Sequence, residues 1–341
     1  MNENCQSQYK PRLFGFATLT AFITFLLIGL GGLVTSHEAG MSVPDWPTSY
    51  GYNMFALPIR FWHGGAFFEH THRLLASAVG ILVTVLAVWL WLKDSRPWMH
   101  WLGVTAFLLV IAQVILGGLR VRLHMDNLGI YHGAIAQTFL VLVCAIALFT
   151  SRWWWVVARG KPVARGLRSH ILFVTALIFV QLLIGATMRH QHAGLSISDF
   201  PLAHGKVWPD TSPEAIAQYN ATRTEMNGEN PITAFQVVLQ MIHRLVAVVI
   251  LLGVAAAAPL ARKRLGGNDG LTKFAWLWLG LVLVQIALGA ATIWLNKAAD
   301  VATAHVMVGA LLLVLGALWW LAATRRTSLT EIASKAQNGV N

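Results

Sequence analysis

Eight apolar runs of about 20 residues each are the feature that most limits what this chain can fold into. A helix of that length crosses the hydrocarbon core of a bilayer, which is roughly 30 Å thick. Only 11% of the 341 residues are charged, whereas a soluble domain carries about 25%. We therefore predict an all-α integral membrane protein with eight transmembrane helices, near residues 14–35, 66–92, 98–119, 129–150, 169–188, 235–259, 272–295 and 301–323.

The first run is interpreted as a retained span and not as a signal peptide, because it is too long and lacks a clear cleavage site. The basic residues alternate from one connecting segment to the next. Of the 25 Lys and Arg, 16 lie in the segments 10–12, 93–96, 152–168, 262–273 and 325–335. The positive-inside rule places these segments, and both termini, in the cytoplasm. The net charge of +11 is then a topology signal, and no nucleic-acid partner is expected.

The second half of the chain repeats the first. Three pairs of segments match in order: 31–51 with 185–205, HRLLA at 72–76 with HRLVA at 243–247, and QVILGGL at 113–119 with QIALGAA at 285–291. The repeat predicts two tandem, pseudo-symmetric four-helix bundles. The predicted N-terminal half is 1–160, and the predicted C-terminal half is 161–341 with a polar tail from Thr324.

One histidine lies near the outer start of every even-numbered span: His72, His132, His243 and His305. Within each half the two histidines are one helical hairpin apart, so their imidazoles are expected at similar depth. Ionisable groups inside a membrane are costly and usually functional. Two facing imidazoles in a four-helix bundle are suitable axial ligands for a heme iron, whereas zinc would need further ligands at the same depth. The alternative for each histidine is an interhelical hydrogen bond.

Charged residues accompany these histidines. Arg73 and Arg244 each follow a histidine, and each could pair with a heme propionate or extend to headgroups or a loop acid. Glu69 precedes His72 by three residues and shares its helix face, whereas its counterpart in the second half is Gln240. A carboxylate beside one pocket only indicates one reactive site and one passive site. The alternative is a salt bridge from Glu69 to a nearby arginine.

The outer loops hold polar residues with smaller expected roles. Asp45 and Asp199 are expected to cap turns, His70 is expected to contact a loop, and the loop 206–234 is expected to cover the bundle. Residues that could reach a propionate from the loop between spans three and four are Arg120, Arg122 and His124. Histidines expected to face solvent are His37, His190, His192 and His204. Two cysteines, Cys5 and Cys144, are too few for a disulfide framework or a thiolate zinc site.

Taken together, the motifs resemble those of the heme A synthase family. They are GGLVTSHEAGMSVPDWP followed by EHTHR, then YHGAIAQ, QMIHR and TAHVMVG, and the resemblance covers spans one to eight. It implies a duplicated four-helix bundle in the bacterial inner membrane. The implied activity is an oxidoreductase that converts a methyl group of heme O to the formyl group of heme A, by two successive hydroxylations and loss of water.

Carried over residue by residue, the resemblance implies that Glu69 and His72 are the family's Glu-x-x-His pair and act in catalysis. His72 and His132 would hold the substrate, heme O. His243 and His305 would be the axial ligands of a heme B cofactor. Many bacterial members carry a cysteine pair in the first outer loop, but residues 36–65 and 189–234 contain no cysteine. Thiol redox chemistry in those loops cannot operate here.

The implied partners are heme O, membrane lipid, heme O synthase and cytochrome oxidase assembly factors, and a homo-oligomer stays open. Two alternative functions also stay open. One is a diheme electron carrier resembling a membrane cytochrome b, and the other is a heme transporter or chaperone. The contrast between Glu69 and Gln240 favours the enzyme, because a symmetric electron carrier has no need for a one-sided carboxylate.

Overall fold

The computed structural model describes residues 9–157, 159–222 and 231–338, and in these ranges it is all-helical, without a β-strand. Eight helices are long and apolar enough to cross a membrane, which confirms the predicted fold class and identifies a multi-pass membrane protein. They are α2 (Pro11–Ser36), α3 (Gly64–Lys93), α4 (Pro97–Leu123), α5 (Leu128–Thr150), α7 (Arg165–His190), α9 (Ala234–Leu265), α10 (Gly270–Trp294) and α11 (Ala299–Asn338).

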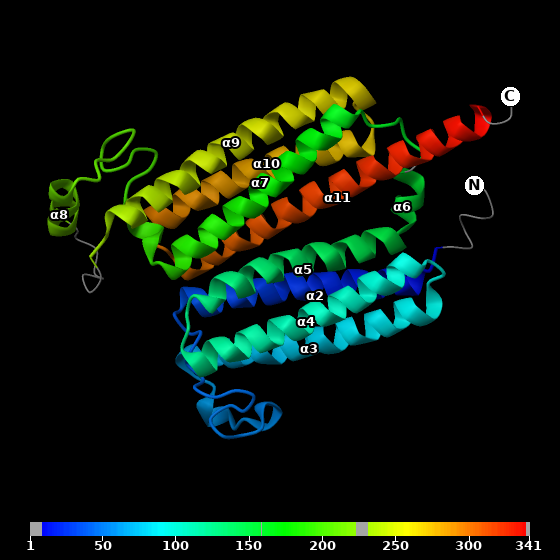
Figure 1. The fold of residues 1–341 in the computed structure, drawn as a ribbon. Coiled ribbons are helices and arrows are strands. Elements are labelled where there is room, and N and C mark those ends of the chain that lie inside the picture. Colours follow the sequence, from blue (N-terminus) through cyan, green and yellow to red (C-terminus); the bar gives the residue numbers. More distant parts are fainter. Residues whose placement is uncertain (1–8, 158, 223–230, 339–341) are drawn as a thin grey trace.

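The eight helices form two closed rings of four. In the first ring α2 packs against α3, α3 against α4, α4 against α5, and α5 back against α2. In the second ring α7, α9, α10 and α11 pack in the same cyclic order. Figure 1 shows the two rings side by side, with the axes of their helices roughly aligned. We call them the N-ring (α2–α5) and the C-ring (α7, α9–α11).

The two rings meet where α2 and α5 lie against α11, and where α5 lies against α7. Leu140 of α5 packs with Ala310 and Val314 of α11 in a small buried cluster. At one end of this contact, Arg189 of α7 donates to the carbonyl oxygen of Gly32 at 2.6 Å and to the Ser36 hydroxyl. Apolar packing along the helices and polar contacts at one end therefore join the rings.

Local sequence explains where several of these helices begin. Pro11 and Pro97 occupy the first helical positions of α2 and α4, where a missing N–H costs nothing. Thr233 and Gln236 form a reciprocal capping box at the start of α9. Asp269 accepts a hydrogen bond from the N–H of Leu271 at the start of α10.

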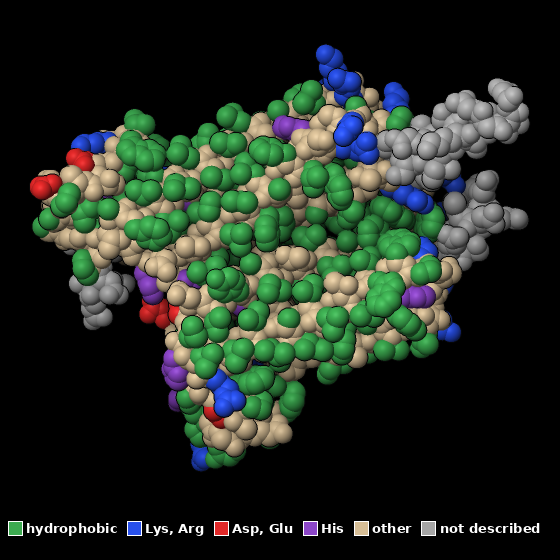
Figure 2. Space-filling view, viewed as in Figure 1, with side chains coloured by type: hydrophobic (Ala, Val, Ile, Leu, Met, Phe, Trp, Pro, Cys, Tyr) green, Lys and Arg blue, Asp and Glu red, His purple; other side chains and the backbone are tan. Residues whose placement is uncertain are grey.

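The two ends of the molecule differ in composition. At one end of the molecule α2 begins, α11 ends and many Lys and Arg side chains lie, as Figures 1 and 2 show, and the surface between the ends is mainly apolar. The opposite end holds the loop with η1 (Met54–Ala56) and η2 (Ile59–Phe61), and the segment with η3 (Ala193–Leu195) and α8 (Pro213–Thr222). We call this the loop end. A short helix, α6 (Arg152–Val157), connects the two rings at the basic end.

Two polar segments are partly helical. In the predicted polar tail from Thr324, α11 continues as a helix to Asn338. The loop 206–234 contains the helix α8, whose residues Ile216 and Tyr219 pack on a buried cluster that includes Ile197 and Val237. Cys144 is a free, half-buried cysteine in α5, and Cys5 lies outside the described residues.

Candidate functional site

Each of the four helix-borne histidines lies against a glycine of the long helix that precedes it. A Cβ atom built on that glycine would lie near the imidazole Cε1 atom, at 3.2 Å for Gly31 and His72, 3.5 Å for Gly117 and His132, 3.4 Å for Gly185 and His243, and 3.1 Å for Gly289 and His305. A Cβ at Gly31 or Gly289 would press on the imidazole, whereas a Cβ at Gly117 or Gly185 would be in ordinary van der Waals contact with it. The same helix–helix packing therefore occurs four times, twice in each ring.

The open nitrogen of three of these rings is Nε2. The Nδ1 atoms of His72, His132 and His243 are buried without a hydrogen-bond partner, whereas their Nε2 atoms are not buried. The side chains as a whole are only half-buried, although each faces a neighbouring helix of its own ring. An accessible Nε2 without a partner is the form of imidazole that binds a metal.

In the C-ring, His243 and His305 face each other at a spacing that suits a shared iron. Their ring centres are 6.4 Å apart and their planes are inclined by 53°. Two imidazoles that bind one metal from opposite sides, each through a nitrogen about 2 Å away, have ring centres roughly 6 Å apart. The pair therefore fits a bis-histidine heme site.

The protonation of His305 supports the same assignment. Its Nδ1 lies 3.1 Å from the carbonyl oxygen of Gln285, and a carbonyl oxygen can only accept, so Nδ1 carries the proton. The lone pair is then on Nε2, where it accepts a hydrogen bond from the Gln285 side-chain amide at 3.3 Å, so a bound iron would replace this contact. Metal-binding histidines characteristically donate their second N–H to such a carbonyl or carboxylate.

The N-ring pair is arranged differently. Among the ring contacts of the described residues, His243 and His305 form a pair, whereas His72 and His132 do not. Among all the residues that the structure describes, no three or more His, Cys, Asp or Glu side chains lie close enough together to hold a metal ion.

Glu69 is buried at the loop end of α3, and both of its oxygens are occupied. Its Oε1 accepts from Arg73 at 2.7 Å, and its Oε2 accepts from the backbone N–H of Val43 at 2.8 Å. Arg73 also donates to the carbonyl oxygens of Val43, Asp45 and Thr48. The salt bridge that was the alternative for Glu69 is therefore present, and the pair clamps residues 42–48 over the N-ring.

Gln240 and Arg244 clamp the corresponding loop of the C-ring. Gln240 accepts from the N–H of Ile197 and donates to the Ile197 carbonyl, and it also accepts from the Ser196 hydroxyl. Arg244 donates to the carbonyl oxygens of Asp199 and Leu202. In the structure, Arg73 and Arg244 both donate to loop carbonyl oxygens. A heme propionate was one of the partners that the sequence suggested for these arginines.

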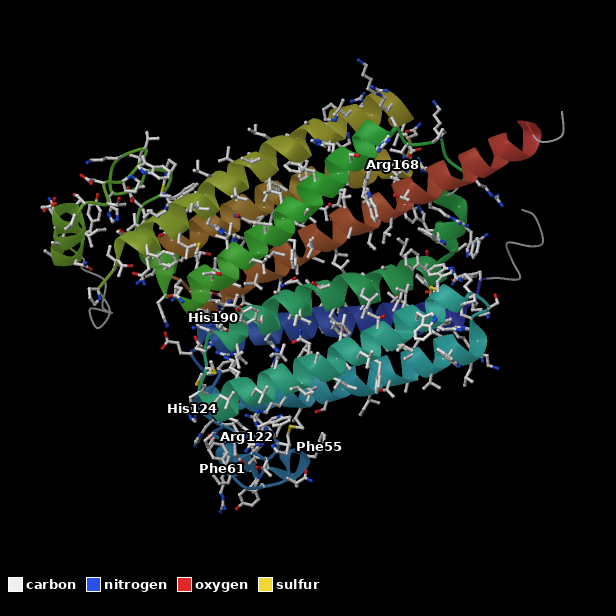
Figure 3. The ribbon with its side chains drawn as sticks, in the orientation of Figure 1. Phe55, Phe61, Arg122, His124, Arg168 and His190 are labelled. Carbon is white, nitrogen blue, oxygen red and sulfur yellow. The ribbon has the colours of Figure 1, made fainter. Side chains whose placement is uncertain are left out.

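The remaining sequence candidates are packed against a loop, exposed at the surface, or stacked on another aromatic ring. His70 is 1% exposed and packs edge-on against Trp62 of the loop, 4.7 Å between ring centres, so the expected loop contact is confirmed. Arg122 and His124 are exposed at the loop end, where Figure 3 shows them. His37 and His192 are exposed as predicted, and His204 stacks on Tyr219 at 3.7 Å.

Arg120 and His190 belong to a contact between the rings. Asp126 pairs with Arg120 through one oxygen and with His190 through the other, at 3.0 Å to Nδ1. Partial burial of Asp126 opposes its ionisation, but the hydrogen bonds from His190 and Arg120 outweigh burial and lower the pKa of Asp126 below 3.8. His190 is therefore not solvent-facing, and the sequence prediction for it was wrong because its partner lies on the other ring.

The predicted turn caps are confirmed in both loops. Asp45 accepts from the Thr48 hydroxyl and from the N–H groups of Tyr50 and Gly51. Asp199 accepts from the N–H groups of His204 and Gly205. Burial of Asp45 favours its neutral form, but the hydrogen bonds outweigh burial and lower its pKa below 3.8.

Three glutamines beside the histidines did not feature among the sequence candidates. Gln113 donates to the carbonyl oxygen of His132 at 3.0 Å, and Gln181 donates to that of His243 at 2.8 Å. Gln285 contacts the ring of His305. The signal that could have found them is the recurring spacing Gln-x-x-x-Gly, present at 113–117, 181–185 and 285–289.

Comparison with known proteins agrees with this geometry. A family model described as cytochrome oxidase assembly protein, COX15-CtaA, matches residues 15–317. The chain belongs to the COX15-CtaA family. The matched range begins within α2 and ends within α11, so the family model includes both rings and all four histidines.

Several curated relatives of this COX15-CtaA protein are named heme A synthase. The one from Rhizorhabdus wittichii is 28% identical over 345 residues, which cover 90% of this chain and 92% of the relative. The one from Alkalihalophilus pseudofirmus is 24% identical, with 87% of this chain and 92% of the relative covered. The one from Shouchella clausii is 29% identical over 58% of this chain, and the match spans 66% of its length, just under two thirds.

Proposed function

We propose that this protein is a heme A synthase, which oxidises a methyl substituent of heme O to the formyl group of heme A. The observation that carries the proposal is the pair of histidine sites on one repeated scaffold, with a carboxylate, Glu69, beside only one of them. The names of the curated relatives support the same activity.

The C-ring would hold heme B as a resident cofactor, with His243 and His305 as axial ligands. The distance between the imidazoles of His243 and His305 and the proton on Nδ1 of His305 support this assignment. When bound, the heme would supply one-electron redox chemistry. Arg244 closes this site from the loop end, and a propionate that paired with it would replace a loop carbonyl.

The N-ring would hold the substrate, heme O, between His72 and His132. Two successive hydroxylations, each of which needs a two-electron oxidant from outside the protein and an oxygen atom from water or dioxygen, would convert the methyl group to an alcohol and then to a hydrated aldehyde. Loss of water from the hydrate would leave the formyl group. Glu69 would be the catalytic carboxylate, since it is the acidic side chain one helical turn from His72. Arg73 and the Val43 N–H occupy its two oxygens, and a carboxylate in this position would stabilise positive charge or accept a proton.

The membrane orientation follows from the charge distribution. We propose a bacterial inner-membrane protein whose termini are cytoplasmic, because α2 begins and α11 ends at the basic end and the loop end holds both long outer loops. The boundary at residue 160 would separate the substrate half (1–160) from the cofactor half (161–341). Heme O synthase and cytochrome oxidase assembly factors would be functional partners.

The test is co-expression with a heme O-producing enzyme, followed by chromatography of the hemes extracted from the membranes. Heme A, with its hydroxylated precursor, is the expected product. A heme-loaded protein that yields neither compound would contradict the enzyme assignment and favour a diheme electron carrier or a heme chaperone.

A further inference from the structure

The first outer loop carries a lobe, residues 50–62, that leaves two large apolar side chains uncovered. Phe55 is 70% exposed and Ile59 is 80% exposed, whereas Leu57 between them is buried. Both exceed the 65% exposure of Ile81, which lies near the middle of the transmembrane helix α3. A single exposed apolar residue is ordinary on a protein surface, but these two are as open as side chains that face acyl chains. Their position relative to the membrane therefore decides what covers them.

The lobe lies beside the N-ring and does not cap it. The short helix η1, which contains Phe55, packs against α3, and Figure 1 shows the segment with η1 and η2 alongside the loop-end turns of that helix. Figure 3 shows Phe55 nearer to the basic end than Phe61 is. The outer turns of a spanning helix pass through the headgroup region, which widens the roughly 30 Å hydrocarbon core to about 40–45 Å. Phe55 therefore lies at the depth of the lipid interface.

A cation accompanies the two apolar side chains. Arg60 is exposed, donates to the Tyr52 hydroxyl at 3.0 Å and lies over the ring of Phe61 at 5.1 Å. None of the ion pairs among the described residues includes Arg60. Aromatic residues gather at the membrane–water interface, and the arginine fork matches the geometry of a phosphate. The lobe thus presents apolar groups for acyl chains and a cation for a phospholipid headgroup.

The lobe is joined firmly to the segment 42–48 that Arg73 clamps over the N-ring. The ring of Tyr50 stacks on that of Phe61, with 5.0 Å between the ring centres and an angle of 15°. The Tyr50 hydroxyl donates to the carbonyl oxygen of Ser42 at 2.6 Å. A displacement of the lobe would therefore pull on the clamped segment, and a fixed lobe would steady it.

We propose that the lobe is a membrane anchor, in which Phe55 and Ile59 insert among the acyl chains of the leaflet at the loop end and Arg60 pairs with a headgroup phosphate. The bilayer is the partner that the geometry favours, because η1 packs against the side of a spanning helix whose own surface faces lipid. The anchor would hold residues 42–48 over the N-ring. The inference is independent of the heme chemistry.

The experiment places the photo-reactive residue p-benzoylphenylalanine in full-length protein in its native membrane. It takes the place of Phe55 or of Ile59, and in two controls the place of Ile81 in α3 or of Gln218 in α8. Gln218 is exposed, on a helix that lies beyond the ends of the spans in Figure 1. After illumination, mass spectrometry identifies the adducts. Phospholipid adducts are expected at Phe55, Ile59 and Ile81, and none at Gln218.

A second set of variants tests the insertion itself, with the photo-reactive residue kept at Phe55. Moving one large apolar side chain from water to an apolar phase shifts an equilibrium by roughly tenfold to a hundredfold. Ile59→Ser should therefore lower the lipid-adduct yield severalfold, whereas Ile59→Leu should leave it unchanged. Arg60→Gln should lower the yield less. The lipid adduct at Ile81 should persist in Ile59→Ser, because the change affects the lobe and not the spans.

Three outcomes would overturn the proposal. The first is an adduct at Phe55 and Ile59 with another protein or with a second copy of this chain, which would make the lobe a protein-docking surface. The second is the absence of any adduct at these two positions while Ile81 reacts with lipid, which would place the lobe in water. The third is an equal lipid-adduct yield in Ile59→Ser and Ile59→Leu, which would show that the apolar side chain does not hold the lobe in the membrane.

Discussion

The N-ring and the C-ring are built alike and differ in a few polar atoms. In both, an arginine that follows a histidine holds the carbonyls of an outer loop, and an aspartate caps the turn of that loop. In both, each histidine lies against a glycine. The difference is concentrated at the pocket, where Glu69 of the N-ring corresponds to Gln240 of the C-ring.

This difference can be followed atom by atom. Gln240 both donates and accepts, so it satisfies the N–H and the carbonyl of Ile197 without a charge. An ionised carboxylate can only accept, so Glu69 bonds the Val43 N–H and leaves the Val43 carbonyl to Arg73. One loop is thus held by an amide and the other by an ion pair. Only the ion pair includes a carboxylate, a group that can take up a proton, and this difference supports the proposal that the chemistry takes place in the N-ring.

The largest expected effect is the loss of one heme but not the other. His243→Ala should lower the heme B content of the purified protein by more than about tenfold, because even outer contacts of metal ligands contribute roughly 10-fold to 100-fold to metal affinity. His72→Ala should leave heme B in place. The measurement is the amount of each heme extracted per mole of protein. Loss of heme B from His72→Ala alone would reverse the assignment of the two rings.

The next effect separates binding from conversion. Glu69→Gln should retain both hemes and lower the yield of heme A by about 10²-fold to 10⁴-fold, the usual contribution of a positioned acid or base. The matched change in the other ring, Gln240→Glu, should not raise the yield. Heme analysis of co-expressing cells measures both variants. An unchanged yield from Glu69→Gln would remove Glu69 from the reaction and leave it as a clamp of the loop.

Much of the fold follows from the sequence for a simple reason. Eight apolar runs can be satisfied only by eight spans, because backbone groups inside a bilayer must bond within their own helix. The observed helices extend beyond the predicted runs, for example Ala234–Leu265 against 235–259, because polar residues continue a helix after it leaves the hydrocarbon region. The helical extension of α11 past Thr324 was not predicted, because hydropathy identifies the residues that lie within the hydrocarbon region and does not show where the helix ends beyond it.

The site was predictable as a set of residue types but not as a set of contacts. The repeat and the spacing identified His72, His132, His243 and His305. The pairing of Asp126 with His190 joins two rings that are distant in sequence, and no local pattern indicates it. The role of Arg73 depends on loop carbonyls, which have no sequence signature.

A smaller effect is expected from the arginines that hold the loops. Arg73→Met should loosen residues 42–48 more than Arg244→Met loosens the corresponding C-ring loop. Hydrogen bonds to charged groups contribute about 1.5–3 kcal/mol, and Arg73 also neutralises the buried Glu69, whereas Arg244 has the neutral Gln240 in that position. Rates of limited proteolysis in the two loops measure the difference. Equal loosening would show that the ion pair adds nothing to the clamp.

The smallest effect concerns the two turn caps. Asp45 accepts one hydrogen bond more than Asp199, from the Thr48 hydroxyl, so Asp45→Asn should destabilise its loop by about 1 kcal/mol more than Asp199→Asn does. The pKa of Asp45 is lowered in the folded protein, so its contribution is complete above pH 3.8 and is lost as the pH falls through the folded pKa. Proteolysis of the first loop by an acid-stable protease should therefore accelerate below pH 3.8 in the wild type. In Asp45→Asn the loop should already be loosened at neutral pH and this acceleration should be absent. If both proteins show the same acid-induced loosening, another group controls it and the Asp45 cap is not the pH-sensitive contact of the N-ring loop.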